Sequence, residues 1–215
     1  MKTITFVRHG QSTANAGGLT MAHDAIPLTA LGHRQAQALA TALQVTPARI
    51  LVSGYSRTHD TARPLCHKFS MVPQVEPLLN EFSTIDPALM QGMDGQQRAP
   101  MADAYWQAAD PLQRMGKVAE TYVEFDQRVC AFMHKLDGLP DQTVVFGHGM
   151  WLGMLVWKLL GFRSADSLAM RAFRGFQLGL PMPNCVVYQL QEAAPGVWRA
   201  QVDEGLLRVL REVSE

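Results

Sequence analysis

An arginine and a histidine follow directly after the first apolar run of the chain. Residues 4–7 are Ile, Thr, Phe and Val, and Arg8, His9 and Gly10 come next. The guanidinium of an arginine is a permanently charged planar fork that matches a phosphate group, and a glycine lets the backbone turn sharply beside a ligand. Uncharged donors follow in residues 12–15. The segment indicates anion chemistry, although such a tripeptide also arises by chance in loops.

Two later strand-like runs end in residues of the same kind. Residues 50–52 lead into small residues and Arg57, and residues 143–146 lead into His148, which stands between two glycines. Alone, an arginine at a helix start is usually solvated, and a lone histidine is more often packed in a core or bound to a metal. However, open α/β sheets bind ligands beyond the carboxyl ends of their strands. Three such strand ends can therefore converge on one site.

Metal coordination is the usual alternative for these histidines. The chain has neither an HxxxH pair nor a carboxylate cluster near them. Its three cysteines, Cys66, Cys130 and Cys185, are far apart and lack CxxC spacing, which argues against a zinc site and against a disulfide framework. We therefore expect no metal and no other cofactor.

The elements around these residues predict the fold class. Thr29 can cap a helix over residues 31–43, and Pro47 lies between that helix and the strand at 50–52. A strand, a helix and a second strand in this order indicate a right-handed parallel crossover. We predict an α/β fold, a three-layer sandwich whose central, mostly parallel sheet has helices on both faces. Its later elements are helices at 58–69, 120–136, 150–160 and 206–213 and strands at 186–190 and 197–202.

Composition limits the possible functions. With 215 residues, 47% of them hydrophobic and 18% charged, the chain can build one sizeable core, so we expect a single domain over residues 1–215. Nineteen basic side chains balance nineteen acidic ones, which offers no overall attraction for nucleic acid or for an anionic membrane, and we expect neither as a partner. The N-terminus has the pattern of neither a signal peptide nor a transmembrane helix, so we expect a cytoplasmic protein. The oligomeric state is not encoded in any motif.

Taken together and in order, the motifs resemble the histidine phosphatase superfamily, which has the phosphoglycerate mutase-like fold. The resemblance covers most of the chain and is carried by several separate segments. These are the RHG loop at 8–15, the following helix from Leu28 to Leu39, the second-arginine motif from Ser53 to Pro64, Leu79 with Glu81, the helix start at 119–121, the second-histidine motif at 147–149, and the turn at 183–185.

This resemblance implies a metal-independent phosphomonoester hydrolase of the histidine acid phosphatase type, acting on a small-molecule phosphate ester. His9 would attack phosphorus and form a covalent phosphohistidine, and Glu81 would be the proton donor. Arg8, Arg57 and His148 would stabilise charge on the transferred group. The phosphate-binding set would be Arg8, Asn15, Arg57, His148 and Gly149.

Some positions depart from the family pattern. Gln11 stands where glutamate is frequent, and Met150 stands where a second glycine is frequent and either narrows the site or begins the helix. Residues 82–87 lack a tryptophan and an acid-glycine pair that the family often shows, which leaves Asp86 or Glu76 as candidates to share the role of Glu81. Further residues that could line the pocket are Gln11, Ser12, His23 and Met150.

The segment over residues 82–118 is the expected cap insertion. It is rich in methionine, and its few cations favour an organic leaving group over a small anionic sugar acid, although ordinary packing also explains the methionines. Two alternatives stay open at this point. One is cofactor-dependent phosphoryl transfer of the phosphoglycerate mutase type, and the other is a non-catalytic phosphate-binding or scaffold domain.

Overall fold

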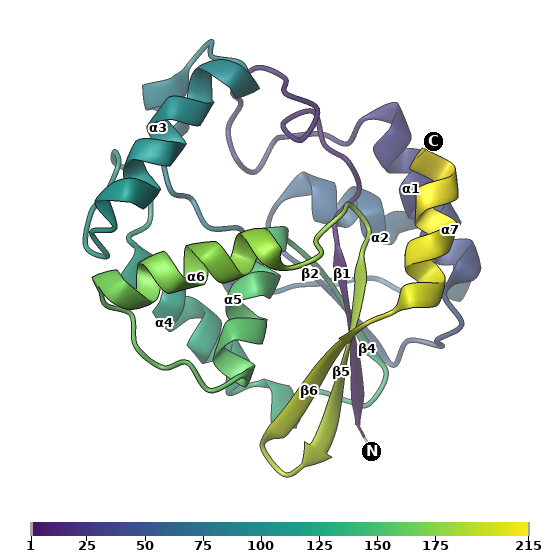
Figure 1. The fold of residues 1–215 in the computed structure, drawn as a ribbon. Coiled ribbons are helices and arrows are strands. Elements are labelled where there is room, and N and C mark those ends of the chain that lie inside the picture. The colour runs from purple at the N-terminus through teal and green to yellow at the C-terminus, as the bar shows by residue number, and fades with distance from the viewer. Residues whose placement is uncertain (1, 215) are drawn as a thin grey trace.

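A mixed sheet forms the centre of the structure, a computed structural model that describes residues 2–214 (Figure 1). The strand order is β3-β2-β4-β1-β5-β6. The first four strands in this order are parallel, and the last two are antiparallel to their neighbours. The predicted, mostly parallel sheet is thus confirmed. The strands are β1 (Thr3–Arg8), β2 (Arg49–Val52), β3 (Gln74–Val75), β4 (Thr143–Gly147), β5 (Val187–Ala194) and β6 (Val197–Val202).

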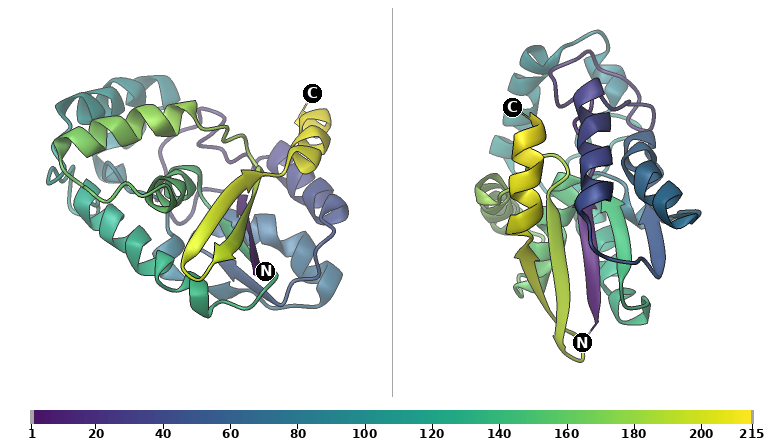
Figure 2. Two further views of the ribbon diagram at one scale, coloured as in Figure 1. Left: turned by 60° about the horizontal axis from the view of Figure 1, so that its bottom comes forward. Right: turned by 90° about the vertical axis from the view of Figure 1, so that its right-hand side faces the viewer.

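Helices cover both faces of the sheet, as predicted for a three-layer sandwich. One group comprises α1 (Ala30–Ala42), α2 (Ser56–Phe69) and α7 (Glu204–Ser214). The two views of Figure 2 place the second group on the other side of the sheet. It comprises α4 (Tyr122–Met133), α5 (Gly149–Leu159) and α6 (Ser167–Gly179), with α3 (Gly95–Ala108) packed against α6. Among the described residues, no helix has the length and apolar character needed to cross a membrane.

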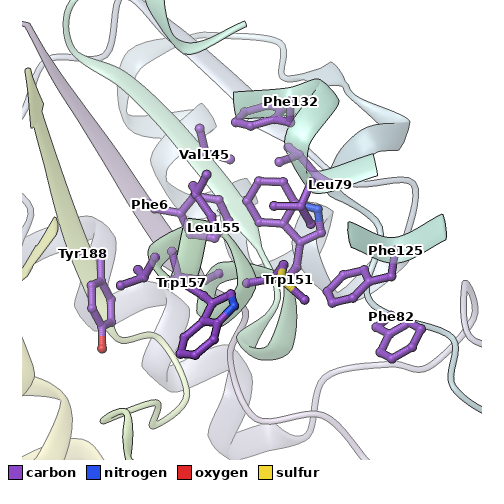
Figure 3. Packing of buried hydrophobic residues seen from close by; sticks show 14 of the residues in the cluster. Phe6, Leu79, Phe82, Phe125, Phe132, Val145, Trp151, Leu155, Trp157 and Tyr188 are labelled. Carbon is purple, nitrogen blue, oxygen red and sulfur yellow. The ribbon is translucent and has the colours of Figure 1, made fainter. Parts of the chain in front are cut away.

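The alternation of side chains along the central strands produces two hydrophobic cores. Phe6 and Val145 face the α4–α6 side, whereas Val7 and Val144 face the α1, α2 and α7 side. Successive side chains of a strand point to opposite faces, and all four of these are fully buried. Figure 3 shows the larger core, in which the ring of Trp151 stacks on Phe6 with their centroids 5.3 Å apart.

Two helices, α3 and α6, were not predicted from the sequence. Only Tyr105 and Trp106 of α3 are buried, so no regular apolar stripe marks this helix, which begins instead at a capping box between Asp94 and Gln97. Likewise, α6 buries only Met170 and Phe173. Contacts with other elements hold α3, and a single-sequence pattern does not reveal them, whereas Met170, Phe173 and Phe176 of α6 have the spacing of an apolar helix face. The short 3₁₀ turns of the structure are η1 (Pro77–Leu79), η2 (Pro87–Met90) and η3 (Leu136–Gly138).

A buried ion pair joins α4 to α5. The ammonium group of Lys158 contacts the carboxylate of Asp126, and both side chains are buried. Removing one partner of a buried pair leaves an uncompensated charge, whereas replacing both by apolar groups of similar size is often close to neutral. The pair therefore fixes how α5 lies on α4, and α5 is the helix that begins directly after His148.

We predict that Asp126→Leu destabilises the protein by about 3–5 kcal/mol, because Lys158 stays buried without its counter-charge. The double variant Asp126→Leu/Lys158→Met should regain most of this loss. Urea unfolding measures both values. Lys135→Met is the control, since its ion pair with Glu76 is half exposed and contributes less than about 1 kcal/mol. Equal effects of Asp126→Leu and the control would contradict the prediction.

Candidate active site

The pairing of β1 with β4 brings the two motif histidines together. Arg8 lies opposite Gly147 in the parallel register, and the backbone N–H of His9 donates to the Gly147 carbonyl at 3.0 Å. The side chains of His9 and His148 therefore leave neighbouring strand ends, and their ring centroids lie 5.2 Å apart. Both rings are buried.

Hydrogen bonding fixes the tautomer of His9. Its Nδ1 lies 2.7 Å from the Gly10 carbonyl oxygen, which can only accept, so the ring proton is on Nδ1. The lone pair is then on Nε2, where it receives a hydrogen bond from Arg57 Nε at 3.2 Å. Burial, followed by the charges of Arg57 and Arg8, holds the pKa of His9 well below its ordinary value of 6.5. His9 is therefore a neutral imidazole with an available nitrogen lone pair.

Close backbone packing holds the loop that carries His9. The N–H of Gly10 donates to Thr61 Oγ1 of α2 at 3.0 Å. A side chain at Gly10 would meet the carbonyl oxygen of Gly32 at 2.6 Å, and a side chain at Gly32 would meet that of Gln11 at 2.1 Å. Only glycines at both positions let the loop lie this near to the start of α1.

Two guanidinium groups flank His9, of which Arg57 is buried and Arg8 is partly buried. Arg57 donates through Nη1 to the His23 carbonyl at 2.7 Å, and its guanidinium lies 4.8 Å from the centre of the Tyr55 ring. Burial lowers the pKa of Arg57 to about 10 and also lowers the pKa of Arg8. Arg8 donates through Nη1 to the Met182 carbonyl, while its Nε is buried without a partner among the described residues. Both groups remain cations at neutral pH and leave donor capacity for a bound anion.

Gly149 makes room for the side chain of Arg8. A Cβ atom at this position would lie 3.1 Å from Arg8 Nε and 3.0 Å from Met182 Cγ. Gly149 is also the first residue of α5, and His148 is its N-cap. Gly149, predicted as a phosphate ligand, thus also leaves the space that the Arg8 side chain occupies.

A chain of hydroxyl groups sets the tautomer of His148. Thr58 donates to the Tyr55 carbonyl at 2.8 Å and therefore accepts from Ser53 Oγ, 3.0 Å away. Ser53 has then used its only proton, so His148 Nε2, at 2.8 Å, must donate to it. Burial and the charge of Arg57 hold the pKa of His148 well below its ordinary value. Its Nδ1 is unprotonated, buried and without a partner in the described part of the chain.

Three donors orient the amide of Asn15. Its Oδ1 accepts from the backbone N–H of Ser12 at 3.2 Å, from the Ser12 hydroxyl at 3.0 Å and from Asn184 Nδ2 at 3.0 Å. Asn184 Nδ2 also donates to the His9 carbonyl at 3.2 Å. Because the amide oxygen is engaged in this way, Asn15 presents its Nδ2 donors to a ligand.

The carboxylate of Glu81 lies at the N-terminus of α5. It accepts backbone hydrogen bonds from Phe82 at 3.0 Å, Met150 at 3.1 Å and Trp151 at 2.9 Å. The free N–H groups of a first helical turn attract negative charge. The indole of Trp151 donates to the Leu78 carbonyl at 2.6 Å and so anchors the chain that leads to Glu81.

A bidentate ion pair braces the same segment from the other side. Arg128 donates to both carboxylate oxygens of Glu120 at 2.7 Å, and through Nη1 to the carbonyls of Leu78 and Asn80 at 2.8 and 2.6 Å. Glu120, which stands in the predicted helix start, lies just before α4 and serves this brace. The backbone on which Glu81 sits is therefore held by α4 as well as by α5.

A cavity of about 220 Å³ opens beside His9, and we name it the catalytic cavity. Many of the site residues predicted from the sequence line this cavity. His148, Gly149, Gln11 and Met150 are not among its lining residues; the side-chain oxygen of Gln11 accepts from Thr29 instead, and Met150 is the second residue of α5. The lining residues are Arg8, His9, Ser12, Ala14, Asn15, Leu19, Thr20, Met21, His23, Ile26, Arg57, Glu81, Phe82, Pro87, Met90 and Arg98.

The two further acids considered from the sequence lie elsewhere. Glu76 pairs with Lys135 and is not among the residues that line the cavity. Asp86 accepts backbone hydrogen bonds from Ala88 at 2.9 Å and from Lys117 at 2.8 Å. Neither carboxylate lines the catalytic cavity, so Glu81 is its only acid among the described residues.

Sequence reasoning assigned no individual role to Ser53, Asn184, Arg128 or Arg98. Ser53 and Asn184 stood in recognised motifs, but only the folded chain shows which atoms they contact. Arg98 is the one lining cation that comes from the cap segment, and its Nη1 donates to the carbonyls of Gly18 and Met93, both at 2.8 Å. Across residues 2–214, no cluster of three or more histidine, cysteine or acidic side chains is arranged to hold a metal ion.

Comparisons with known proteins point to one family. A model of the histidine phosphatase superfamily (branch 1) matches residues 4–200. The adenosylcobalamin/alpha-ribazole phosphatases of Salmonella typhimurium and Escherichia coli are 30% and 33% identical over 175 and 165 residues, covering 80% and 74% of this chain and 86% and 79% of theirs. A mycobacterial glucosyl-3-phosphoglycerate phosphatase of known structure is 25% identical with a TM-score of 0.67, over 94% of this chain and 97% of that one.

Arg57→Met should raise the pKa of His9 towards its ordinary value, because the substitution removes the largest charge that opposes protonation of the ring. An NMR titration of the His9 ring carbon shifts measures this change. Below its pKa the His9 ring is protonated, and Nε2 then has no lone pair. As the pH falls, the variant therefore loses the neutral ring at a higher pH than the parent does. Arg63→Met, an exposed position of the same helix, is the control. A His9 pKa that Arg57→Met leaves unchanged would contradict the electrostatic interpretation.

Proposed function

The chain belongs to the histidine phosphatase superfamily (branch 1), and from this premise we propose that it is a phosphomonoester hydrolase of the histidine acid phosphatase type that works through a phosphohistidine on His9. The single observation that carries the proposal is the state of His9. Its ring is neutral, its proton is on Nδ1, and its Nε2 accepts a hydrogen bond from Arg57 beside a cavity that Arg8 also lines. A nucleophile needs such a lone pair, and a mere anion-binding residue does not.

In the first step, His9 Nε2 attacks phosphorus. The new N–P bond forms as the bond between phosphorus and the ester oxygen breaks, and Arg57 moves its hydrogen bond from Nε2 to a phosphoryl oxygen. The step requires Glu81 in its protonated form; the carboxylic acid gives that proton to the leaving oxygen, which departs as an alcohol, and Glu81 becomes a carboxylate. The position of Glu81 in the wall of the catalytic cavity supports this role.

In the second step, water hydrolyses the phosphohistidine. Glu81, now a carboxylate, takes a proton from the attacking water, a P–O bond forms and the N–P bond breaks. The products are inorganic phosphate and the neutral imidazole of His9. No metal ion is needed in either step, because the guanidinium groups supply the positive charge that stabilises the transferring phosphoryl group.

The phosphoryl oxygens are held by Arg8, Arg57, His148 and Asn15. Arg8 Nε has no partner among the described residues, and the Oδ1 of Asn15 is engaged by Asn184, which leaves its Nδ2 for a ligand; both observations support their assignment to the phosphate. The bare Nδ1 of His148 shares the proton of a phosphate monoanion. Preorganised donors of this kind are usually the largest contribution to catalysis of phosphoryl transfer.

The segment 82–118 is the cap of a single domain. Phe82, Pro87, Met90 and Arg98 bring it to the wall of the catalytic cavity, so it meets the alcohol part of the ester. A phosphoglycerate mutase of this fold is the second candidate, since it needs the same nucleophile. Arg98 is the only cap cation at the cavity among the described residues, and its Nη1 is used by the protein backbone. That scarcity of cations favours hydrolysis of a less charged ester.

Incubation with a ³²P-labelled aryl phosphate should give an acid-labile, base-stable phosphoenzyme, and His9→Ala should abolish both the label and the turnover. His33→Ala, an exposed histidine of α1, is the matched control and should behave as the parent. If the parent protein neither labels nor hydrolyses any phosphoester, the non-catalytic binding domain becomes the better explanation.

The same assay decides between the enzymatic alternatives. Hydrolysis should persist in EDTA, and 3-phosphoglycerate with its bisphosphate primer should give negligible isomerisation. Loss of all activity in EDTA would refute the metal-independent mechanism. Robust primer-dependent isomerisation with negligible hydrolysis would instead identify the chain as a mutase.

Asn184→Leu should lower kcat/KM by roughly tenfold, the effect of losing about one hydrogen bond to a charged group. The substitution removes the donor that orients Asn15 and contacts the His9 carbonyl. A double-mutant cycle with Asn15→Leu separates these contacts. If Asn184 acts through Asn15, the effects of the two substitutions on kcat/KM are less than additive. Full additivity, or an Asn184→Leu variant with unchanged kinetics, would exclude that role.

A further inference from the structure

A second cavity, which we name the side cavity, lies next to the catalytic cavity. Its volume is about 640 Å³, large enough for the alcohol part of a sugar or nucleoside ester. The two cavities share four lining residues, Thr20, Met21, His23 and Pro87. An alcohol attached to a phosphoryl group in the catalytic cavity can therefore extend into the side cavity.

Three separate segments build the side cavity. Residues 20–24 follow the RHG loop, Tyr55 precedes α2, and residues 83–91 with Val118 belong to the cap. The ring of Tyr55 also packs against the His148 ring, with the centroids 5.2 Å apart. The side cavity is thus bounded by the same elements that hold the phosphate-binding groups.

The charges of the two cavities are opposite. The catalytic cavity is lined by Arg8, Arg57 and Arg98 with Glu81 as its one acid, whereas the side cavity is lined by Asp24 and Asp86 and, among the described residues, by no lysine or arginine. Backbone hydrogen bonds from Ala88 and then Val118 lower the pKa of Asp86, so this carboxylate is ionised at neutral pH. His23 adds no positive charge there, since burial lowers its pKa below the ordinary value.

The remaining polar groups suit hydroxyl-bearing ligands. Tyr55, Gln91, Thr20 and Ser83 supply uncharged donors and acceptors to the lining, and carboxylates accept hydrogen bonds from sugar hydroxyls. A carboxylate or second phosphate on the alcohol would meet Asp24 and Asp86 with no cation to offset the repulsion. The lining therefore discriminates by charge as well as by size.

We propose that the side cavity binds the alcohol part of the substrate, and that this alcohol is an uncharged, hydroxyl-bearing sugar or nucleoside rather than a hydroxy acid. The proposal rests on the phosphomonoesterase function proposed above. It assigns substrate specificity to Asp24, Asp86 and the uncharged lining residues. Gln91 is an exposed lining side chain at the end of η2, and a charge introduced there should change the choice of substrate.

The test compares three esters on the purified full-length protein: phenyl phosphate as the small reference, ribose 5-phosphate as the uncharged alcohol and 3-phosphoglycerate as the anionic one. The ratio of kcat/KM for ribose 5-phosphate to that for 3-phosphoglycerate should exceed one by roughly tenfold or more, since the anionic alcohol meets like charges.

Charge variants at Gln91 then test whether the side cavity causes this preference. Gln91→Lys should lower the ratio, and Gln91→Glu should raise it. Gln37→Lys, the same change on the exposed face of α1, should leave the ratio unchanged.

The outcomes separate the two proposals. Failure of the parent protein to hydrolyse even phenyl phosphate would overturn the proposed function. Hydrolysis of phenyl phosphate together with equal or better use of 3-phosphoglycerate would overturn the side-cavity proposal alone. If Gln91→Lys and Gln37→Lys change the kcat/KM ratio in the same way, the side-cavity proposal is also overturned.

Discussion

The parallel pairing of β1 with β4 is the constraint on which the site depends. The register that places Arg8 opposite Gly147 also makes the His9 N–H donate to the Gly147 carbonyl, so the two histidine-bearing turns leave the sheet at one level. A side chain at Gly147 would come within 2.5 Å of the Phe6 ring, so the core packing of β1 also requires this glycine. A slip of one residue would turn Phe6 and Val7 to the wrong faces and separate the histidines at the same time.

Helix α5 links the packing of the hydrophobic core to the position of Glu81. Trp151 stacks on Phe6 and packs against Phe132, and the same residue donates through its backbone to Glu81 and through its indole to Leu78 (Figure 3). A large side chain that is fully buried has little freedom to move. The position of Glu81 relative to the β1 strand end is thus determined by an aromatic cluster that lies away from the catalytic cavity.

The sequence predicted those parts of the molecule that depend on local pattern. Apolar runs followed by Arg8, Arg57 and His148 indicated three strand ends and their convergence, because parallel strands share one carboxyl edge. Helix α3 escaped prediction because no apolar periodicity marks it, whereas α6 places Met170, Phe173 and Phe176 at helical spacing, a signal that is present in the sequence but was not used in the prediction. The contacts of Ser53 and Asn184 were equally inaccessible, because a tautomer or an amide orientation is decided by atoms brought together from distant parts of the chain.

Preorganisation in this site has an energetic cost that the cores must offset. Arg8 Nε and His148 Nδ1 are buried without partners in the described residues, and each such group costs about 1–3 kcal/mol. An anion that fills these bonds recovers that cost on binding, so part of the affinity for phosphate is stored in the folded chain. The adjoining side cavity has no comparable cations among its described residues. In the proposed reaction, binding energy is therefore concentrated on the phosphoryl group, and the proposed side-cavity specificity comes from weaker polar contacts and from repulsion of like charge.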